Sequence, residues 1–168
     1  MQAEQELIRR AQRGATDAVD ELFRRHWGGL WRTAYGLTAR RDLANDVAQE
    51  AFVRGVSSLR RFDPTRPLAP WLARIAVNLV VDEHRRERRL APAVESAAVV
   101  EPDDVDDEVV AAVGRLAPER RLIVALHYWL DYTTPEIAQL LDLPLGTVAS
   151  RLSRALDDLR TDLEAEHV

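Results

Sequence analysis

Apolar residues recur at helical spacing along almost the whole chain, and no segment shows the alternation of apolar and polar residues that is typical of a strand. The pattern therefore predicts an all-α fold. In the first forty residues it predicts three helices, at about 2–13, from 16 or 17 with Val19, Leu22, Phe23 and Trp27 facing inward, and at about 29–37. Gly14 is expected to end the first of them, since glycine is favoured just after a helix.

The segment RRDLANDVAQEAFVRGVSSLRRF has the pattern of an amphipathic helix with Asp42 as its cap. Its inward stripe is Leu43, Val47, Ala51 and Val56, and its outward polar residues are Asp46, Gln49, Glu50 and Arg54. After it, FDPTRPLAP (62–70) contains three prolines in nine residues. Proline does not donate in a helix and disfavours a helical predecessor, so this segment is expected to be a loop.

A helix is expected to restart at Trp71, with Leu72, Ile75, Ala76 and Leu79 buried and Trp71, Arg74, Asn78, Asp82 and Arg85 on a neighbouring face. Its end is strongly basic, with Arg85, Arg86, Arg88 and Arg89. Residues 91–106 then lose periodicity, gain prolines and become acidic, which is typical of a flexible linker. We therefore predict two small helical domains, 1–90 and 107–168, joined by this acidic linker.

The second domain is expected to contain helices at 107–116 and 118–130, followed by a helix-turn-helix at 133–160. Thr133 and Glu136 have the spacing of a capping box. Ile137, Ala138 and Leu141 are expected to be buried, Asp142 and Leu143 to form the turn, and Pro144 to open the second helix. The predicted inward positions of that helix are Val148, Leu152, Ala155, Leu156 and Leu159.

Four polar residues face outward near the start of this second helix: Thr147, Ser150, Arg151 and Arg154. Arginine can bond bidentately to guanine, hydroxyl side chains can bond bases or phosphates, and the first turns of a recognition helix reach base edges in the major groove. An ordinary helical hairpin with a solvated polar side is the alternative. The short turn, the small Ala138 at the helix crossing and the early basic residues favour DNA reading.

The net charge of −5 hides a strong asymmetry along the chain. Residues 1–90 hold 17 Arg against 12 acidic residues, whereas residues 91–112 hold 7 acidic residues and no basic one. Such a modest local positive charge predicts weak, salt-sensitive DNA binding by the isolated protein. A DNA-binding role therefore calls for a partner.

Several other classes of function find little support in the sequence. Cysteine is absent, the four histidines show no metal-ligand spacing, and the glycines form no phosphate-binding loop, so no metal, cofactor or catalytic centre is expected and the protein is not expected to be an enzyme. The N-terminus contains no apolar signal segment, and no run is long enough to cross a bilayer. A cytoplasmic protein without membrane insertion is expected.

In the first domain, Trp71, the proline-rich loop and the basic helix end together offer flat rings and positive charge, as single-stranded DNA binding requires. Trp71 could equally be a core residue, and the arginines could be a solvated helix end favoured by the helix dipole. The residues alone leave both readings open.

Two long segments resemble a known family. LANDVAQEAFVRGVSSLRRF followed by APWLARIAVNLVVDEHRRERR resembles the second conserved region of bacterial sigma factors of the extracytoplasmic-function group. LAPERRLIVALHYWLDYTTPEIAQLLDLPLGTVASRLSRALDDLR resembles their fourth conserved region. The order of the two segments, with a linker between them, is also that of the family.

The resemblance implies a protein that binds core RNA polymerase, directs it to promoters and helps to open the DNA. It implies that polymerase is bound by Asp46, Gln49, Glu50 and Arg54. It implies that the minus-ten element is captured by Phe62, Trp71, Arg74 and Asn78, with phosphate contacts from Arg85, Arg86, Arg88 and Arg89. It also implies that the minus-thirty-five element is read by Thr147, Ser150, Arg151 and Arg154. An anti-sigma factor is a possible further partner. Ala149 and Ser153 depart from the usual pattern, so the minus-thirty-five sequence does not follow from the resemblance.

The main alternative is a free-standing regulator that binds its operator as a dimer and uses the first domain for dimerisation or sensing. It explains the helix-turn-helix but not the rest of the chain. A polymerase-binding adaptor is a second alternative, against which the DNA-reading residues argue.

Overall fold

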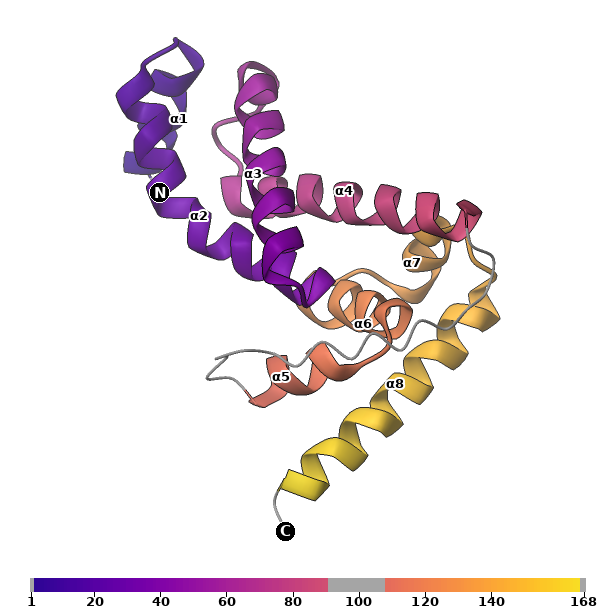
Figure 1. Cartoon of the computed structure of the whole chain (residues 1–168). Helices are drawn as coiled ribbons and strands as arrows, with labels where there is room; N and C mark the ends of the chain where they lie inside the picture. The colour runs from indigo at the N-terminus through magenta and orange to yellow at the C-terminus, as the bar shows by residue number, and fades with distance from the viewer. Residues whose placement is uncertain (1, 91–107, 167–168) are drawn as a thin grey trace. The chain divides into compact units, whose positions relative to one another are not determined.

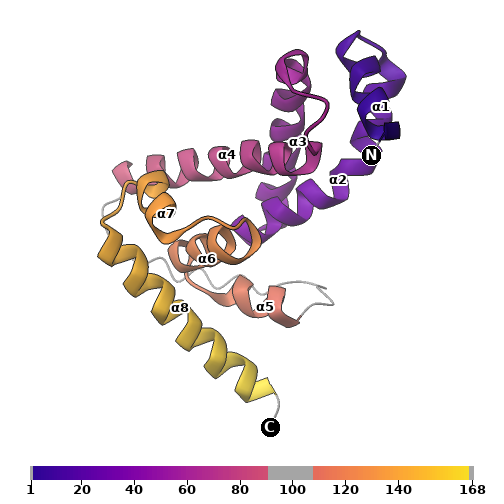
Figure 2. The same ribbon diagram turned by 180° about the vertical axis from the view of Figure 1, so that it is seen from behind.

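The computed structural model describes residues 2–90 and 108–166, and within them it contains helices and no strand. The all-α prediction is therefore confirmed, whereas the predicted linker, 91–106, lies outside the described residues. In the first part of the chain the helices are α1 (Gln2–Gln12), α2 (Thr16–Thr38), α3 (Arg41–Ser58), the short 3₁₀ helix η1 (Leu59–Arg61) and α4 (Leu68–Leu90) (Figure 1). In the second part they are α5 (Glu108–Arg115), α6 (Pro118–Val124), the π-helix η2 (Ala125–Trp129), α7 (Thr134–Leu141) and α8 (Leu145–Glu166) (Figure 2).

The described residues form two compact units. One contains residues of 1–35 and 41–80, and the other contains residues of 36–40 and 81–168. The predicted domain boundaries at residues 90 and 107 remain predictions.

Helix α2 is a single helix, so the prediction of separate helices on either side of Gly28 and Gly29 is wrong. Glycine inside a helix costs about 1 kcal/mol relative to alanine. Leu22, Leu30 and Ala34 recur at spacings of eight and four residues and are 2%, 4% and 0% exposed. Their burial along one helix face outweighs the cost of the glycine pair.

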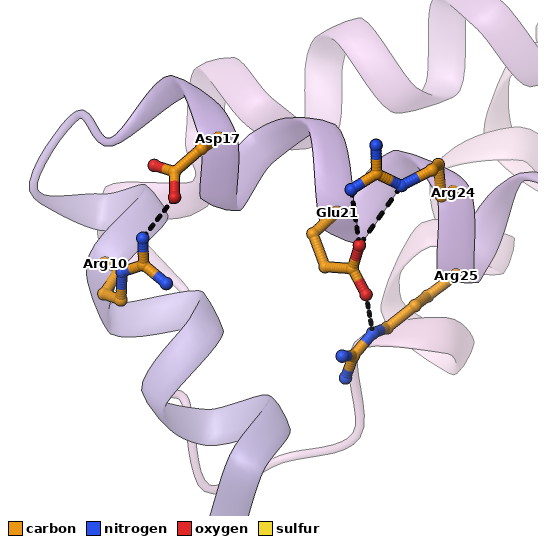
Figure 3. Close-up of polar contacts among 5 residues, drawn as sticks. All are labelled: Arg10, Asp17, Glu21, Arg24 and Arg25. Carbon is orange, nitrogen blue, oxygen red and sulfur yellow. Dashed lines mark hydrogen bonds and ion pairs between the residues drawn. The ribbon is translucent and has the colours of Figure 1, made fainter.

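Helices α1 and α2 form a hairpin around the buried Ile8, Ala18 and Leu22. The connection turns at Gly14, whose φ of +91° is a conformation that glycine adopts without strain. At the surface of the hairpin Arg10 pairs with Asp17, and Glu21 accepts hydrogen bonds from Arg24 and Arg25 (Figure 3). Donation from Arg24, and then from Arg25, lowers the pKa of the Glu21 carboxyl. These pairs are exposed, so packing rather than charge stabilises the hairpin.

Helices α3 and α4 approach closely at Gly55. A Cβ atom at this position would lie 2.5 Å from Cδ2 of Leu72 and 3.5 Å from Cζ3 of Trp71. Leu72 is itself only 2% exposed, so there is little room for it to move away. Gly55 therefore allows the contact that sets the position of Trp71.

Helix α4 begins earlier than predicted, and its buried face agrees only in part with the predicted one. It starts at Leu68, so Pro70 lies in its first turn rather than in the loop. The first turn of a helix has no intrahelical acceptors for its N–H groups, and proline is tolerated there. Leu72 and Ala76 are buried, as predicted. Val77 and Val81 are also buried, whereas Ile75 and Leu79, predicted to be buried, are half-buried.

The core of the second unit lies where α5 and α6 pack on α8. It contains the buried Val113, Leu116, Val124 and Ala155, with Leu152 and Leu159 packed against them. Helix α6 continues through Val124 into η2 without a cap, which agrees with the prediction of one helix at 118–130. The last turn differs from that prediction because it is widened to a π-helix. A widened turn of this kind interrupts the regular hydrogen-bond pattern just before the helix-turn-helix.

The helix-turn-helix has the predicted capping box. The Thr133 hydroxyl accepts a hydrogen bond from Glu136 N, and the Glu136 carboxylate accepts one from Thr133 N at 2.8 Å. Asp142 ends α7 in the left-handed conformation (φ 53°), and Leu143 N donates to Ala138 O at 2.9 Å. Pro144 precedes α8 and accepts hydrogen bonds from the helix through its carbonyl, so it is the cap rather than the first helical residue.

Replacing Thr133 with Ala is expected to lower the free energy of unfolding by about 1 kcal/mol, because the substitution removes the hydroxyl that caps α7. Urea unfolding followed by circular dichroism measures this change. Thr134→Ala is the matched control, since Thr134 is the first residue inside the helix. An equal loss of stability in both variants would contradict the role given to the cap.

Candidate nucleic-acid interface

The predicted polymerase-binding residues form one exposed face of α3. Asp46, Gln49, Glu50 and Arg54 are all exposed, while Ala44, Val47, Ala48 and Ala51 face inward. Arg54 Nε donates to Glu50 Oε1 at 2.7 Å, an i,i+4 ion pair along the helix. We refer to the four residues as the polar α3 face. It is set on a regular helix, so its groups have a fixed spacing.

Two exposed apolar side chains, Val53 of α3 and Phe23 of α2, were not predicted, and the expectation that Phe23 faces inward is wrong. Val53 is 53% exposed between Gln49, Glu50 and Arg54, and Phe23 of α2 is 38% exposed. The Phe23 ring packs edge-on against the Phe52 ring, with centroids 5.0 Å apart. Apolar residues with a polar surround are typical of protein interfaces. The sequence could have indicated the exposed valine, because Val53 is an apolar residue among the polar residues on the outward side of the predicted helix.

The start of the loop at 62–67 is folded inward. Phe62 is buried, and its ring contacts the ring of Trp71 with centroids 4.7 Å apart and planes at 43°. Trp71 is half-buried, so part of its ring faces solvent. In this structure the buried Phe62 ring packs against the Trp71 ring, and Phe62 itself is not part of the exposed surface.

Asp63 organises the next residues of this loop. Its Oδ1 accepts hydrogen bonds from Thr65 N at 3.0 Å and from the Thr65 hydroxyl at 2.8 Å. The backbone hydrogen bond, followed by the hydroxyl bond, lowers the pKa of the Asp63 carboxyl. Arg66 N also donates to Asp63 O at 3.0 Å, which closes a turn. The loop therefore has a defined conformation before any ligand binds.

Five of the predicted minus-ten residues share one side of α4: Trp71, Arg74, Asn78, Arg85 and Arg89, at successive spacings of three, four, seven and four residues. Arg74 and Asn78 are exposed, Arg85 is half-buried, and Arg86 and Arg89 are exposed. The side chain of Arg88 lies outside the described part of the chain. Trp71, Arg74 and Asn78 thus offer an aromatic ring, a positive charge and an amide over about two helical turns.

The predicted reading face of α8 is Thr147, Ser150, Arg151 and Arg154. Ser150 and Arg154 are exposed, and Thr147 and Arg151 are half-buried. The Ser150 hydroxyl donates to Thr147 O at 3.0 Å. Of the two arginines, Arg154 is therefore the exposed one, while Arg151 is partly enclosed.

Glu119 holds Arg151 in place and was not predicted. Arg151 Nη2 lies 2.7 Å from Glu119 Oε2, and both side chains are about one-third exposed or less. Nη1 of Arg151 is buried and finds no hydrogen-bond acceptor among the residues that the structure describes. Residues 119 and 151 are 32 positions apart, so no local signal in the sequence links them. Arg151 is thus both a candidate DNA contact and part of the packing of α8 on α6.

Two further ion pairs join α8 to the helices beneath it. Arg120 of α6 pairs with Asp158, and Arg115 Nε of α5 lies 3.1 Å from Asp162 Oδ2. Together with the Glu119–Arg151 pair they follow one side of α8 from its first turns to its end. Helix α8 is therefore held by ion pairs as well as by its apolar side.

Within 2–90 and 108–166, no group of three or more His, Cys, Asp or Glu side chains could hold a metal ion. None of the helices described in these ranges has the length and apolar character that a membrane span requires.

Two family models match the chain. The model described as sigma-70 region 2 matches residues 22–90, and the model described as sigma-70 region 4 matches residues 106–159. The first match contains the polar α3 face, the loop and α4, and the second contains α5 to α7 and most of α8.

Curated relatives resemble the chain over most of their length. The extracytoplasmic-function (ECF) RNA polymerase sigma factor SigL of Mycobacterium tuberculosis is 32% identical over 85% of this chain and 87% of its own. The ECF sigma factor SigW of Bacillus subtilis is 25% identical over 93% and 94%. Among solved structures, CnrH in complex with the cytosolic domain of CnrY is 28% identical, with a TM-score of 0.55 over 97% of this chain and 98% of that one. CnrH is a sigma factor of Cupriavidus metallidurans.

Proposed function

The chain belongs to the extracytoplasmic-function RNA polymerase sigma factors of the sigma-70 family, and we propose that its surfaces divide the work of promoter-specific initiation among them. The protein binds core RNA polymerase, directs it to promoters and helps to melt the minus-ten element. The observation that carries this conclusion is the match of both sigma-70 regions, in order, over residues that place an exposed polar helix face before a capped helix-turn-helix.

The first domain, residues 1–90, supplies polymerase binding and minus-ten recognition. The polar α3 face is exposed and has a fixed spacing, as docking on a protein requires. Trp71, Arg74 and Asn78 offer stacking and polar groups for an unpaired base, and Phe62 supports the Trp71 ring. Exposed Arg86 and Arg89 lie further along α4 and suit phosphates.

The second domain, residues 107–168, reads the minus-thirty-five element. Ser150 and Arg154 are exposed in the first half of α8, and Thr147 and Arg151 on the same helix are half-buried. The ion pair with Glu119 limits the positions that Arg151 can occupy. Arg154 is accordingly the principal charged contact in the major groove, and Arg151 combines a contact with a positioning role.

The remaining features of the proposal follow from this role. The protein initiates transcription through polymerase, without a catalytic centre of its own, and acts in the cytoplasm where polymerase is found. An anti-sigma factor is the expected regulatory partner, since CnrH was solved with the cytosolic domain of another protein, CnrY. Residues 91–106 act as the linker that lets each domain reach its own DNA element.

Co-migration with core RNA polymerase tests the proposal against a free-standing dimeric regulator. A sigma factor is expected to elute with core polymerase in gel filtration and to bind promoter DNA tightly only in that complex, because its own charge is −5. A dimeric regulator would elute as a dimer and bind its operator without polymerase. The second result would overturn the proposal.

A further inference from the structure

A side chain at the end of α1 is hydrogen-bonded to the backbone of η1 and to the first residue of the loop after it. Gln12 is the last residue of α1, and its Nε2 donates to Leu59 O at 2.9 Å and to Phe62 O at 2.8 Å. The bonds span 47 and 50 residues of the chain. Gln12 precedes residues 22–90, which the region 2 model matches, so the family match assigns it no role.

The geometry requires a group that donates twice. Both acceptors are backbone carbonyls, so only the amide nitrogen of Gln12, with its two hydrogens, can satisfy them together. Leu59 O also accepts from Phe62 N at 2.9 Å, which makes it part of the turn that ends η1. Gln12 therefore fixes the backbone where the chain leaves η1 and enters the loop.

A short series of contacts leads from this amide to the surface. The Phe62 carbonyl is held by Gln12, the Phe62 ring contacts Trp71, and Trp71 is partly exposed beside Arg74. The anchor end is rigid, because Ile8 and Ala11 of α1 are 0% and 8% exposed in the core. The side chain of Gln12 is thus attached to packed structure at one end and to the loop at the other.

We propose that Gln12 is a positioning residue for minus-ten capture: it holds Phe62 and through it Trp71 in the orientation that receives an unpaired base. Flipping a base out of the duplex has an energetic cost, which a pocket already in the right shape reduces. The inference rests on the proposed function of the loop and α4. It gives α1, which neither family model covers, a part in promoter opening.

The test uses the full chain in complex with core polymerase and a promoter fragment recovered by transcript mapping. Gln12→Met keeps the length of the side chain and removes both donors, and Gln12→Glu presents acceptors to the two carbonyls. Permanganate reactivity of unpaired thymines measures opening, and gel filtration measures core binding. Both variants are expected to slow opening about ten- to thirtyfold, the order expected from losing two hydrogen bonds, with core binding unchanged.

Two controls separate positioning from stability. Gln5→Met makes the same change on the same helix, at a half-buried position, and should leave opening unchanged. Gln12→Lys restores donors toward the carbonyls and should recover most of the opening rate.

The inference is overturned if Gln12→Met opens the promoter normally, if Gln12→Lys is as slow as Gln12→Met, or if opening and core binding fall together. If the wild-type complex itself opens no promoter, the proposed function fails and this inference with it. If the wild-type complex opens the promoter and the Gln12→Met complex opens it at the same rate, only this inference is overturned and the proposed function stands.

Discussion

Replacing Asp46 and Glu50 with Arg is expected to weaken binding to core RNA polymerase by about a hundredfold or more. Both carboxylates are exposed on the polar α3 face, and reversing two charges at a complementary interface costs several kcal/mol. The fold should persist, since among the residues that the structure describes the variant loses one exposed ion pair, between Glu50 and Arg54. Competition with a labelled wild-type chain for core polymerase measures the effect.

The matched control makes the same change of charge on two other helices, α2 and α8. Asp20→Arg with Glu164→Arg also reverses two exposed acidic residues. This control should bind core polymerase normally. Equal weakening by both double variants would mean that overall charge, and not the polar α3 face, determines docking.

Replacing Arg154 with Ala is expected to reduce initiation that depends on the minus-thirty-five element about 5- to 150-fold, the range for one base-reading side chain. Arg151→Ala should cost more, because it removes a contact and also leaves the Glu119 carboxylate unpaired near the DNA phosphates. Adding Glu119→Gln to Arg151→Ala should then recover part of the activity. Run-off transcription from a promoter with an intact or scrambled minus-thirty-five element measures all three variants.

Arg160→Ala is the control for this series. Arg160 is an exposed arginine of the same helix, paired with Asp157, and lies beyond the reading face. It should leave initiation unchanged, and core polymerase binding should be normal in every variant of the series. Loss of polymerase binding with Arg154→Ala, or no recovery with Glu119→Gln, would contradict the division of roles between the two arginines.

Much of the fold could be predicted from local patterns. The capping box at Thr133 and Glu136 was visible as a spacing of three residues, and the structure has both of its hydrogen bonds. The outward side of α3 was visible as a helical stripe and is exposed. Such features depend on neighbouring residues, so the sequence contains all the information that they require.

The errors and omissions come from contacts between distant residues. Helix α2 continues across Gly28 and Gly29 because residues along one of its faces are buried, although glycine on its own disfavours a helix. The Glu119–Arg151 pair joins two helices, and the hydrogen bonds of Gln12 join α1 to η1 and to the loop that follows it. Periodicity shows which side of a helix is buried but not which polar side chains meet across the fold.

The central claim, that this chain is a promoter-specificity factor, is tested most directly by transcription from genomic fragments with core polymerase in the presence and absence of the protein. Sequencing of the transcript ends should reveal discrete start sites that require the protein and share two upstream motifs at a fixed spacing. Start sites that are the same without the protein, or that share no upstream motif, would contradict the claim.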